Sequence, residues 1–251
     1  MRARGFSSGL SCYVHSLLSK GGTLVHIDVW AELSCPWCYL GIRHLRRALA
    51  EFPHATQVEV CLHAFLLEAE LDHALDIPRK VHRIEDLGES LEEVLAEDAR
   101  LEKLGRAEGI VFDFDHAIVA PTTSAHRAVA AATDFDLVND TSCGADTSAL
   151  KLAEAIGRAH FEMALDISDP DVLIGCAQDI GMPAEYVIDA LASSEYASRV
   201  FSDFQIGIQM GIECLPTYLF DRRFVVEDHQ TVTALSNILA TAYENSGKDL
   251  R

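Results

Sequence analysis

The first part of the chain alternates hydrophobic and polar residues in two runs that flank a helical pattern. In residues 24–30 and 58–64, every second residue is hydrophobic, so these side chains share one face of an extended chain. This pattern is typical of strands packed against a core. Between them, hydrophobic positions recur at helical spacing over residues 36–52, and Pro53 marks the end of that helix. A strand, a helix and a strand within about 40 residues predict a βαβ unit with parallel strands.

Helical spacing dominates the middle of the chain, from residue 71 to residue 211. The boundaries between helices are marked by residues that commonly start or stop them, such as Asp169-Pro170 at a start and Gly181 at an end. One helix is expected to bury four aliphatic residues opposite an acidic face: Leu87, Leu91, Val94 and Leu95. We therefore expect this block to contain helices only.

Strand-like sequence returns after residue 211. Residues 217–220 and 224–226 flank residues 221–223, whose composition suits a hairpin turn. The hydrophobic spacing over 232–242 then predicts a closing amphipathic helix. The order βαβ, helical block, ββα is that of an α/β thioredoxin fold with a large all-helical insertion at the crossover.

This order divides the chain into three parts. Residues 1–23 form an N-terminal tail, residues 24–70 and 212–245 together form the thioredoxin-like domain, and residues 71–211 form the helical insertion domain. The tail carries two arginines but lacks a continuous apolar core, so it is a poor secretory signal. We interpret it as a loose tail or as the product of a misassigned start.

Charge and composition narrow the classes of partner. A formal net charge of −19 argues against nucleic acid and anionic membranes, because phosphate binding needs clustered lysine and arginine. No apolar segment approaches the ~20 residues that span a bilayer. The seven cysteines are odd in number and mostly scattered, which fits a reducing cytoplasm better than a secreted protein. Four of them are interpreted as structural or incidental: Cys12, Cys61, Cys143 and Cys176.

Cys35 and Cys38 are separated by two residues at the predicted junction of strand and helix. A thiol attacks a disulfide as its thiolate, and the N–H groups and dipole at a helix N-terminus stabilise that charge. Pro36 suits the first helical position because it has no N–H to leave unpaired. Cys38 lies one turn further in, where it can attack a mixed disulfide. We predict that Cys35 is the nucleophile and Cys38 the resolving cysteine.

The same Cys-x-x-Cys spacing occurs in zinc sites, which need two further ligands. No second Cys-x-x-Cys or His-x-x-x-His pair stands out to supply them. A glycine-rich phosphate loop is also missing from the sequence. We therefore expect neither a metal site nor a cofactor.

Leu215-Pro216-Thr217 supplies the second half of the predicted site. In a thioredoxin-like fold, a cis proline at the start of the third strand faces the cysteine pair and leaves the preceding backbone free to pair with an extended substrate. A cis bond before proline costs only about 0.5–1 kcal/mol. The alternative is an ordinary turn or edge-strand proline. Cys214 is interpreted as a small buried apolar residue, with a part in the exchange chemistry as the alternative.

The segment 28–41, which contains Cys-Pro-Trp-Cys-Tyr, resembles the active-site region of the DsbA-like oxidoreductases of the FrnE group. Weaker matches extend the resemblance over residues 24–242: Phe65–Glu68, Ala125–Arg127, Asp166–Pro170, Ser194–Ala197 and Leu215–Thr217. The resemblance implies a thioredoxin fold with a helical insertion and dithiol–disulfide oxidoreductase activity. It also implies that His126 lines the site.

Two features depart from the pattern of this family. Residues 228–230 are Asp-His-Gln where the family usually has a Gly-Ala-Gln-like segment, and Cys214 is an additional cysteine. The related hydroxychromene-carboxylate isomerases and kappa-class glutathione transferases bind glutathione and typically have serine at the first cysteine position. Cys35 together with Cys38 therefore favours the redox branch.

We predict a cytoplasmic thiol–disulfide oxidoreductase that acts on proteins or on small thiols such as glutathione. Substrate contacts are expected at six residues: Pro36, Trp37, His126, Leu215, Pro216 and Thr217. One alternative is a glutathione-dependent isomerase or transferase with the same fold. The other is a non-enzymatic redox-sensing or chaperone-like module. A homodimer is compatible with this sequence.

Overall fold

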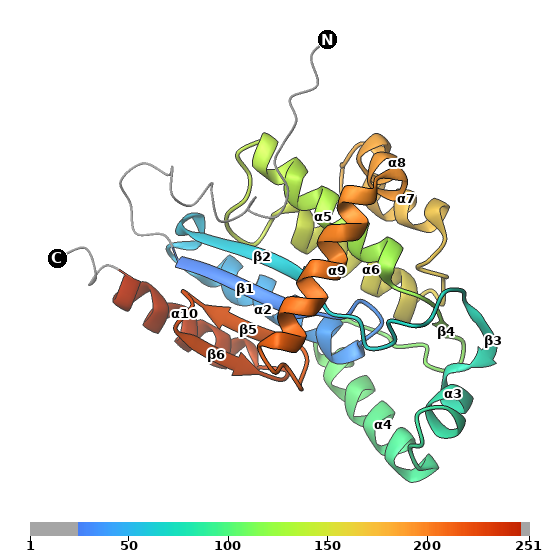
Figure 1. Cartoon of the computed structure of the whole chain (residues 1–251). Helices are drawn as coiled ribbons and strands as arrows, with labels where there is room; N and C mark the ends of the chain where they lie inside the picture. The colour runs from blue at the N-terminus through green and yellow to red at the C-terminus, as the bar shows by residue number, and fades with distance from the viewer. Residues whose placement is uncertain (1–24, 247–251) are drawn as a thin grey trace.

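A four-stranded sheet forms the centre of the computed structural model, which describes residues 25–246 (Figure 1). Its strands are β1 (Val25–Ala31), β2 (Val58–Ala64), β5 (Thr217–Phe220) and β6 (Phe224–Glu227), in the order β2-β1-β5-β6. The predicted tail 1–23, with Cys12, lies outside the described residues.

The two halves of the sheet pair as the hydrophobic pattern predicts. β1 and β2 are parallel, with Val25 opposite Val58 and Ala31 opposite Ala64. β5 runs antiparallel to β1, and β6 runs antiparallel to β5. The hairpin turn between β5 and β6 includes Asp221, whose φ is +46°. Strands far apart in sequence therefore become neighbours at the centre of the molecule.

Helix α2 (Pro36–Glu51) connects β1 with β2 and packs with α10 (Val232–Ser246) behind the sheet as drawn in Figure 1. A 3-10 turn, η1 (Ala55–Gln57), follows α2. Helix α9 (Ser194–Gln209) crosses the opposite face of the sheet, where Trp30 and Phe65 pack with Phe204. The sheet is therefore covered by helices on both faces, which is why both alternating sets of β1 side chains are largely buried.

The segment between β2 and β5 consists mainly of helices. They are α3 (Arg79–Glu85), α4 (Leu91–Ala107), α5 (Thr123–Val138), α6 (Ser148–Phe161), α7 (Pro170–Asp179), α8 (Ala184–Ala192) and α9. Asp169 caps α7 by accepting a hydrogen bond from the N–H of Asp171, and Gly181 follows its end with φ +81°, as predicted. The helices α5 to α8 pack mainly on one another, and α6 also packs on α2.

The same segment contains a small two-stranded sheet, so the expectation of helices only is wrong in this detail. Its strands are β3 (Leu75–Pro78) and β4 (Ile118–Val119), which pair antiparallel. With four and two residues, they are too short to produce a readable alternation of hydrophobic and polar positions. The assignment of an α/β thioredoxin fold with a helical insertion is unaffected.

The buried face of helix α4 differs from the one predicted from Leu87, Leu91, Val94 and Leu95. Only Val94 of that set is buried, and the three leucines are about half-exposed. A capping box of Ser90 and Glu93 starts the helix at Leu91, so Leu87 lies before it. The buried positions are Val94, Asp98, Leu101 and Gly105. Asp98 can be buried because it pairs with arginines of α3.

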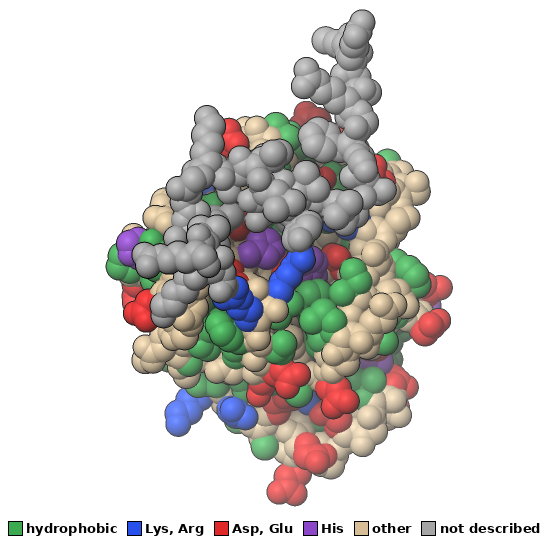
Figure 2. Space-filling model, turned by 60° about the vertical axis from the view of Figure 1, so that its left-hand side comes forward, with side chains coloured by type: hydrophobic (Ala, Val, Ile, Leu, Met, Phe, Trp, Pro, Cys, Tyr) green, Lys and Arg blue, Asp and Glu red, His purple; other side chains and the backbone are tan. Residues whose placement is uncertain are grey.

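The surface reflects the acidic composition. On the face drawn in Figure 2, acidic side chains are widely spread, while lysine and arginine appear only in small groups. Within residues 25–246, none of the helices has the length and apolar character that a membrane span needs.

Candidate functional site

Cys35 stands directly before helix α2, at its N-cap position. The β1 strand ends at Ala31, and the N–H of Cys35 donates to the carbonyl of Glu32 over 3.2 Å, which closes a turn. Pro36 is the first helical residue, as predicted, because its fixed φ and missing N–H suit that position. The sulfur of Cys35 therefore lies where unpaired backbone N–H groups favour a negative charge.

Cys38 lies one turn into α2 and is more deeply buried than Cys35. The exposed fraction of Cys38 is 1%, against 8% for Cys35. The N–H of Glu32 donates to the Cys38 sulfur over 3.4 Å. Burial raises the pKa of the Cys38 thiol well above its usual value, and the hydrogen bond with Cys35 and the charge of Cys35 add to this effect. The more exposed sulfur is thus the one at the helix end.

Glu32 is a buried carboxylate beside the cysteine pair that the sequence analysis did not identify. Its oxygens accept hydrogen bonds from the N–H of Ser34 at 3.3 Å, the N–H of Leu67 at 3.0 Å and His126 Nε2 at 3.3 Å. Burial alone would raise the pKa of Glu32, but the bond and ion pair with His126 outweigh it and lower that pKa. A negative charge is therefore held next to Cys38.

His126, expected to line the site, reaches it only through Glu32. It lies on α5, is 5% exposed, and contacts the buried Glu32 carboxylate. Its contribution is to hold the buried Glu32 carboxylate in place through this contact. A direct contact of His126 with substrate remains a prediction that this placement does not favour.

The Leu215–Pro216 bond is cis, as the sequence analysis predicts. The Pro216 ring lies against α2, because a methyl group added at Gly41 would be 2.7 Å from Pro216 Cγ. Thr217 is fully buried, and its hydroxyl donates to the carbonyl of Cys214 over 2.6 Å. The structure thus brings the start of β5 to the helix that carries the cysteines.

Cys214 is exposed, so its interpretation as a small buried residue is wrong. It lies in the bend that precedes β5, where the buried positions are Ile212 and Pro216 instead. A bend of this kind has no strand or helix period from which burial could be read.

Trp37 is half-buried between two segments that are distant in sequence. Its indole Nε1 donates to Glu97 of α4 over 2.7 Å, and the Arg100 guanidinium lies 4.8 Å from its ring centroid. The ring centroid of His229, which lies in the loop before α10, is 5.4 Å from that of Trp37. Burial and the nearby His44 lower the pKa of His229 to about 4. Trp37 therefore links the insertion with the thioredoxin-like sheet beside the cysteines.

Tyr218 and Gly41 are two further residues at this junction that the sequence analysis missed. Tyr218 is completely buried, two positions after Pro216 on β5. A methyl group at Gly41 would lie 2.6 Å from the Tyr218 hydroxyl oxygen. A glycine in the middle of α2, where glycine is unfavourable, was the one available signal.

A network of histidines and carboxylates lies elsewhere on the sheet. Asp28 pairs with both His26, at 3.2 Å, and His63, at 2.8 Å. The second ring nitrogens of these histidines pair with Glu59 and Asp203. Among the described residues, the ligand atoms of His26, Asp28 and Cys61 lie within 4.8 Å of one another here, but the Cys61 sulfur is already in a disulfide bond. Because His26 and Asp28 are already paired with other side chains, we interpret the network as a structural link.

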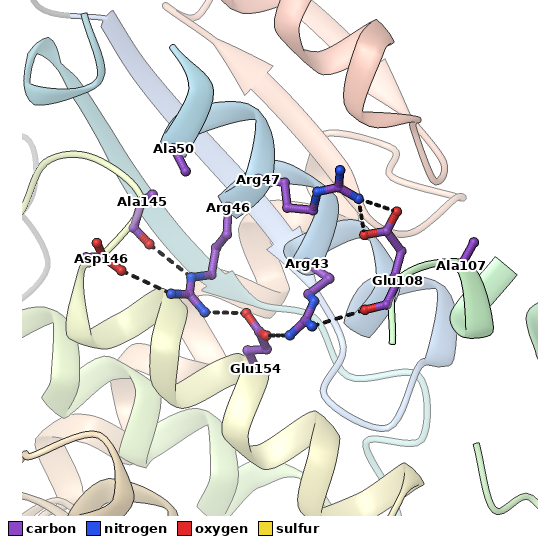
Figure 3. Close-up of a pocket in the computed structure, with 9 residues that line it drawn as sticks. All are labelled: Arg43, Arg46, Arg47, Ala50, Ala107, Glu108, Ala145, Asp146 and Glu154. Atoms are coloured by element: carbon purple, nitrogen blue, oxygen red, sulfur yellow. Dashed lines mark hydrogen bonds and ion pairs between the residues drawn. The ribbon is translucent and has the colours of Figure 1, made fainter. Parts of the chain in front are cut away.

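A cavity of about 390 Å³ lies against α2, and neither cysteine of the pair lines it. Figure 3 shows Arg43 and Arg46 both pointing to Glu154 of α6, and Arg47 pointing to Glu108. The positive charges of α2 are thus balanced by carboxylates of the insertion. We interpret this region as an ionic link between helices.

Comparison with protein families gives one match that spans most of the chain. The family described as DSBA-like thioredoxin domain matches residues 26–240. A comparison with curated proteins finds no match.

Solved structures with the same fold include proteins described as a DsbA oxidoreductase, a disulfide reductase and an isomerase. A protein described as a probable DsbA oxidoreductase from Streptomyces coelicolor is 25% identical, with a TM-score of 0.73 over 88% of this chain and 91% of that chain. The cytosolic disulfide reductase DsbM from Pseudomonas aeruginosa, solved with GSH, is 20% identical, with a TM-score of 0.61 over 87% and 99%. A 2-hydroxychromene-2-carboxylate isomerase is 13% identical, with a TM-score of 0.57 over 90% and 99%. At these identities, the last two similarities show a shared fold only.

Proposed function

Because the chain belongs to the family of DsbA-like thioredoxin domains, we propose that it is a dithiol–disulfide oxidoreductase whose reacting sulfurs are those of Cys35 and Cys38. The observation that carries the proposal is the unequal placement of these sulfurs. Cys35 stands at the N-terminus of α2, while Cys38 is buried with the pKa of its thiol raised by burial. This is the asymmetry that an attacking and a resolving thiol need.

The reaction proceeds by two exchanges of sulfur partners. The Cys35 thiolate attacks a substrate disulfide, a mixed disulfide forms, and the first substrate sulfur leaves as a thiolate that takes a proton from water. Cys38, after losing its proton, attacks the Cys35 sulfur, and the second substrate sulfur leaves. The substrate is reduced to two thiols while Cys35 and Cys38 become a disulfide. The reverse sequence oxidises a dithiol.

The substrate side of the site would be formed by the start of β5 and the surface around Trp37. Leu215, Pro216 and Thr217 would offer backbone groups to an extended substrate, as in strand addition. Pro36 and Trp37 would contact the groups next to the reacting sulfur. Substrate proteins or small thiols such as glutathione, a cytoplasmic location, a homodimer and membership of the FrnE subgroup belong to this proposal.

Cysteine-to-serine variants test the proposal through reduction of insulin with a thiol reductant. Cys35→Ser should lose activity about 1,000-fold or more, because it removes the nucleophile of the first exchange. Cys38→Ser should keep the first exchange and accumulate a substrate adduct on Cys35, detected by mass spectrometry. Cys143→Ser, which changes a loop cysteine outside the pair, should behave as the unmodified protein.

Full activity of Cys35→Ser would contradict the proposal. Glutathione-dependent turnover of a chromene-type substrate that continues in Cys38→Ser would instead assign the chain to the isomerase branch of the fold.

A further inference from the structure

The hydroxyl of Tyr218 has no hydrogen-bond partner among the described residues, although the side chain is completely buried. An unpaired buried donor is destabilising, so its presence in a folded protein requires an explanation. Phe220, two residues later on the same face of β5, is also completely buried. A phenyl ring without a hydroxyl is thus acceptable to this core. Packing therefore explains the ring of Tyr218 but not its hydroxyl group.

This hydroxyl lies on the side of α2 that carries the cysteines. Tyr218 pairs with Val29 of β1 and belongs to the same core cluster as Cys35 and Cys38. The position of a Gly41 methyl would be 2.6 Å from the Tyr218 oxygen, and Gly41 follows Cys38 by three residues, about one helical turn. The absence of a side chain at Gly41 therefore leaves room for the oxygen beside the cysteine-bearing turn.

The electrostatic environment is consistent with a neutral donor next to the sulfurs. Burial raises the pKa of the Tyr218 hydroxyl well above its usual value, and the charges of Cys38, Asp228 and Cys35 raise it further. Tyr218 thus keeps its proton while a neighbouring sulfur is ionised. In the reduced protein, Cys38 accepts its hydrogen bond from the N–H of Glu32 instead.

We propose that the Tyr218 hydroxyl donates a hydrogen bond to the Cys38 sulfur when that sulfur is a thiolate, and so assists the resolving step. The inference rests on the proposed oxidoreductase function. The Cys38 thiol gives its proton to water, its thiolate attacks the Cys35 sulfur, and the bond between Cys35 and the substrate sulfur breaks. The substrate thiolate then takes a proton from water. Tyr218 keeps its own proton throughout and stabilises only the charge on Cys38.

Tyr218→Phe in a Cys35→Ser background tests the hydrogen bond without any turnover. The pH midpoint of Cys38 alkylation by iodoacetamide, followed on the Cys38 peptide by mass spectrometry, should rise by about one unit, the effect of losing one hydrogen bond to a charged group. Tyr196→Phe is the matched control, because it removes a hydroxyl that is bonded to Asp134 of the insertion. In Tyr196→Phe, the pH midpoint of Cys38 alkylation should remain that of the Cys35→Ser protein. An unshifted midpoint in Tyr218→Phe would overturn the inference.

A second measurement leaves the side chain in place. In the Cys35→Ser protein labelled with ¹³Cζ-tyrosine, the signal that Tyr218→Phe removes should shift with the same midpoint as Cys38 alkylation. A signal that does not respond to Cys38 ionisation would also overturn the inference.

The two proposals fail separately. If the unmodified chain shows no disulfide reduction while the Cys38 midpoint still depends on Tyr218, the proposed function falls and the hydrogen bond stands. If the chain reduces disulfides and the Cys38 midpoint does not depend on Tyr218, only the proposed hydrogen bond is contradicted. In the active protein, loss of the bond should slow resolution of the mixed disulfide about threefold, because the tenfold lower thiolate fraction is partly offset by the greater nucleophilicity of a more basic thiolate.

Discussion

Gly41 is the residue at which helix α2, the Pro216 ring and the Tyr218 hydroxyl approach one another most closely. An added methyl group would be 2.6 Å from the Tyr218 oxygen and 2.7 Å from Pro216 Cγ, which are distances that real carbon atoms do not adopt. Neither neighbour can move easily, because the proline ring is rigid and the tyrosine is completely buried. One missing side chain thus sets the spacing between the two halves of the site.

Gly41→Ala should destabilise the protein by about 1–3 kcal/mol, because the steric overlap outweighs the gain in helix propensity. Gly175→Ala in α7 is the matched control, since nothing lies within 4 Å of its added methyl. That substitution should stabilise the protein by about 0.5–1 kcal/mol. Urea unfolding of both variants measures the difference. Equal effects of the two substitutions would contradict the close approach at Gly41.

Helix α2 is held in place by charged contacts as well as by its hydrophobic face. Arg43 and Arg46 both donate to the buried carboxylate of Glu154 on α6, as Figure 3 shows. Breaking a buried ion pair by removing one partner costs about 3–5 kcal/mol, but these arginines are partly exposed, which reduces the effect. The element that carries the cysteines is therefore positioned partly by the insertion.

Glu154→Gln should lower the free energy of unfolding by about 2 kcal/mol, because Arg43 and Arg46 lose the buried carboxylate that they share. Glu102→Gln makes the same chemical change in an exposed pair with Arg106 and should cost less than about 0.5 kcal/mol. Thermal or urea unfolding at low and high salt compares the two. A loss in Glu154→Gln no larger than that in Glu102→Gln would show that the link contributes little.

At the scale of the whole molecule, the network around Asp28 joins both parallel strands with helix α9. Burial alone would lower the pKa values of His26 and His63, but hydrogen bonds with Asp28, Glu59 and Asp203 outweigh burial and raise both to about 9. Both imidazoles are therefore charged in the folded protein at neutral pH. Their ion pairs tie the sheet to the helix that covers one of its faces.

Stability should fall as the pH rises through about 9. A histidine whose pKa is raised on folding contributes its full stabilisation below the ordinary value of 6.5 and loses it as the pH passes the folded value of about 9. We expect a loss of about 2 kcal/mol per histidine, after allowance for solvent screening. His63→Gln should remove its share of this pH dependence. His116→Gln, at a solvent-exposed histidine paired with Asp113, should remove much less, because solvent screens that pair. A flat dependence in the unmodified protein would contradict the charged network.

The strand and helix periods were sufficient to predict the main architecture. Residues 24–30, 36–52 and 58–64 fold as the predicted strand, helix and strand, within one or two residues at each boundary. The prediction failed where the period was absent or misleading. The strands β3 and β4 are too short to show one, and α4 buries Asp98, because the arginines that neutralise it come from another helix.

The sequence by itself determined the βαβ and ββα order, the position of Cys35 before a helix and the presence of a proline at the start of β5, because these depend on local preferences of neighbouring residues. Only the tertiary structure decided that Glu32 meets His126 and that Tyr218 lies beside Gly41. Those pairs are separated by many residues, and their energies depend on burial and on contacts between elements. A local pattern carries no information about either.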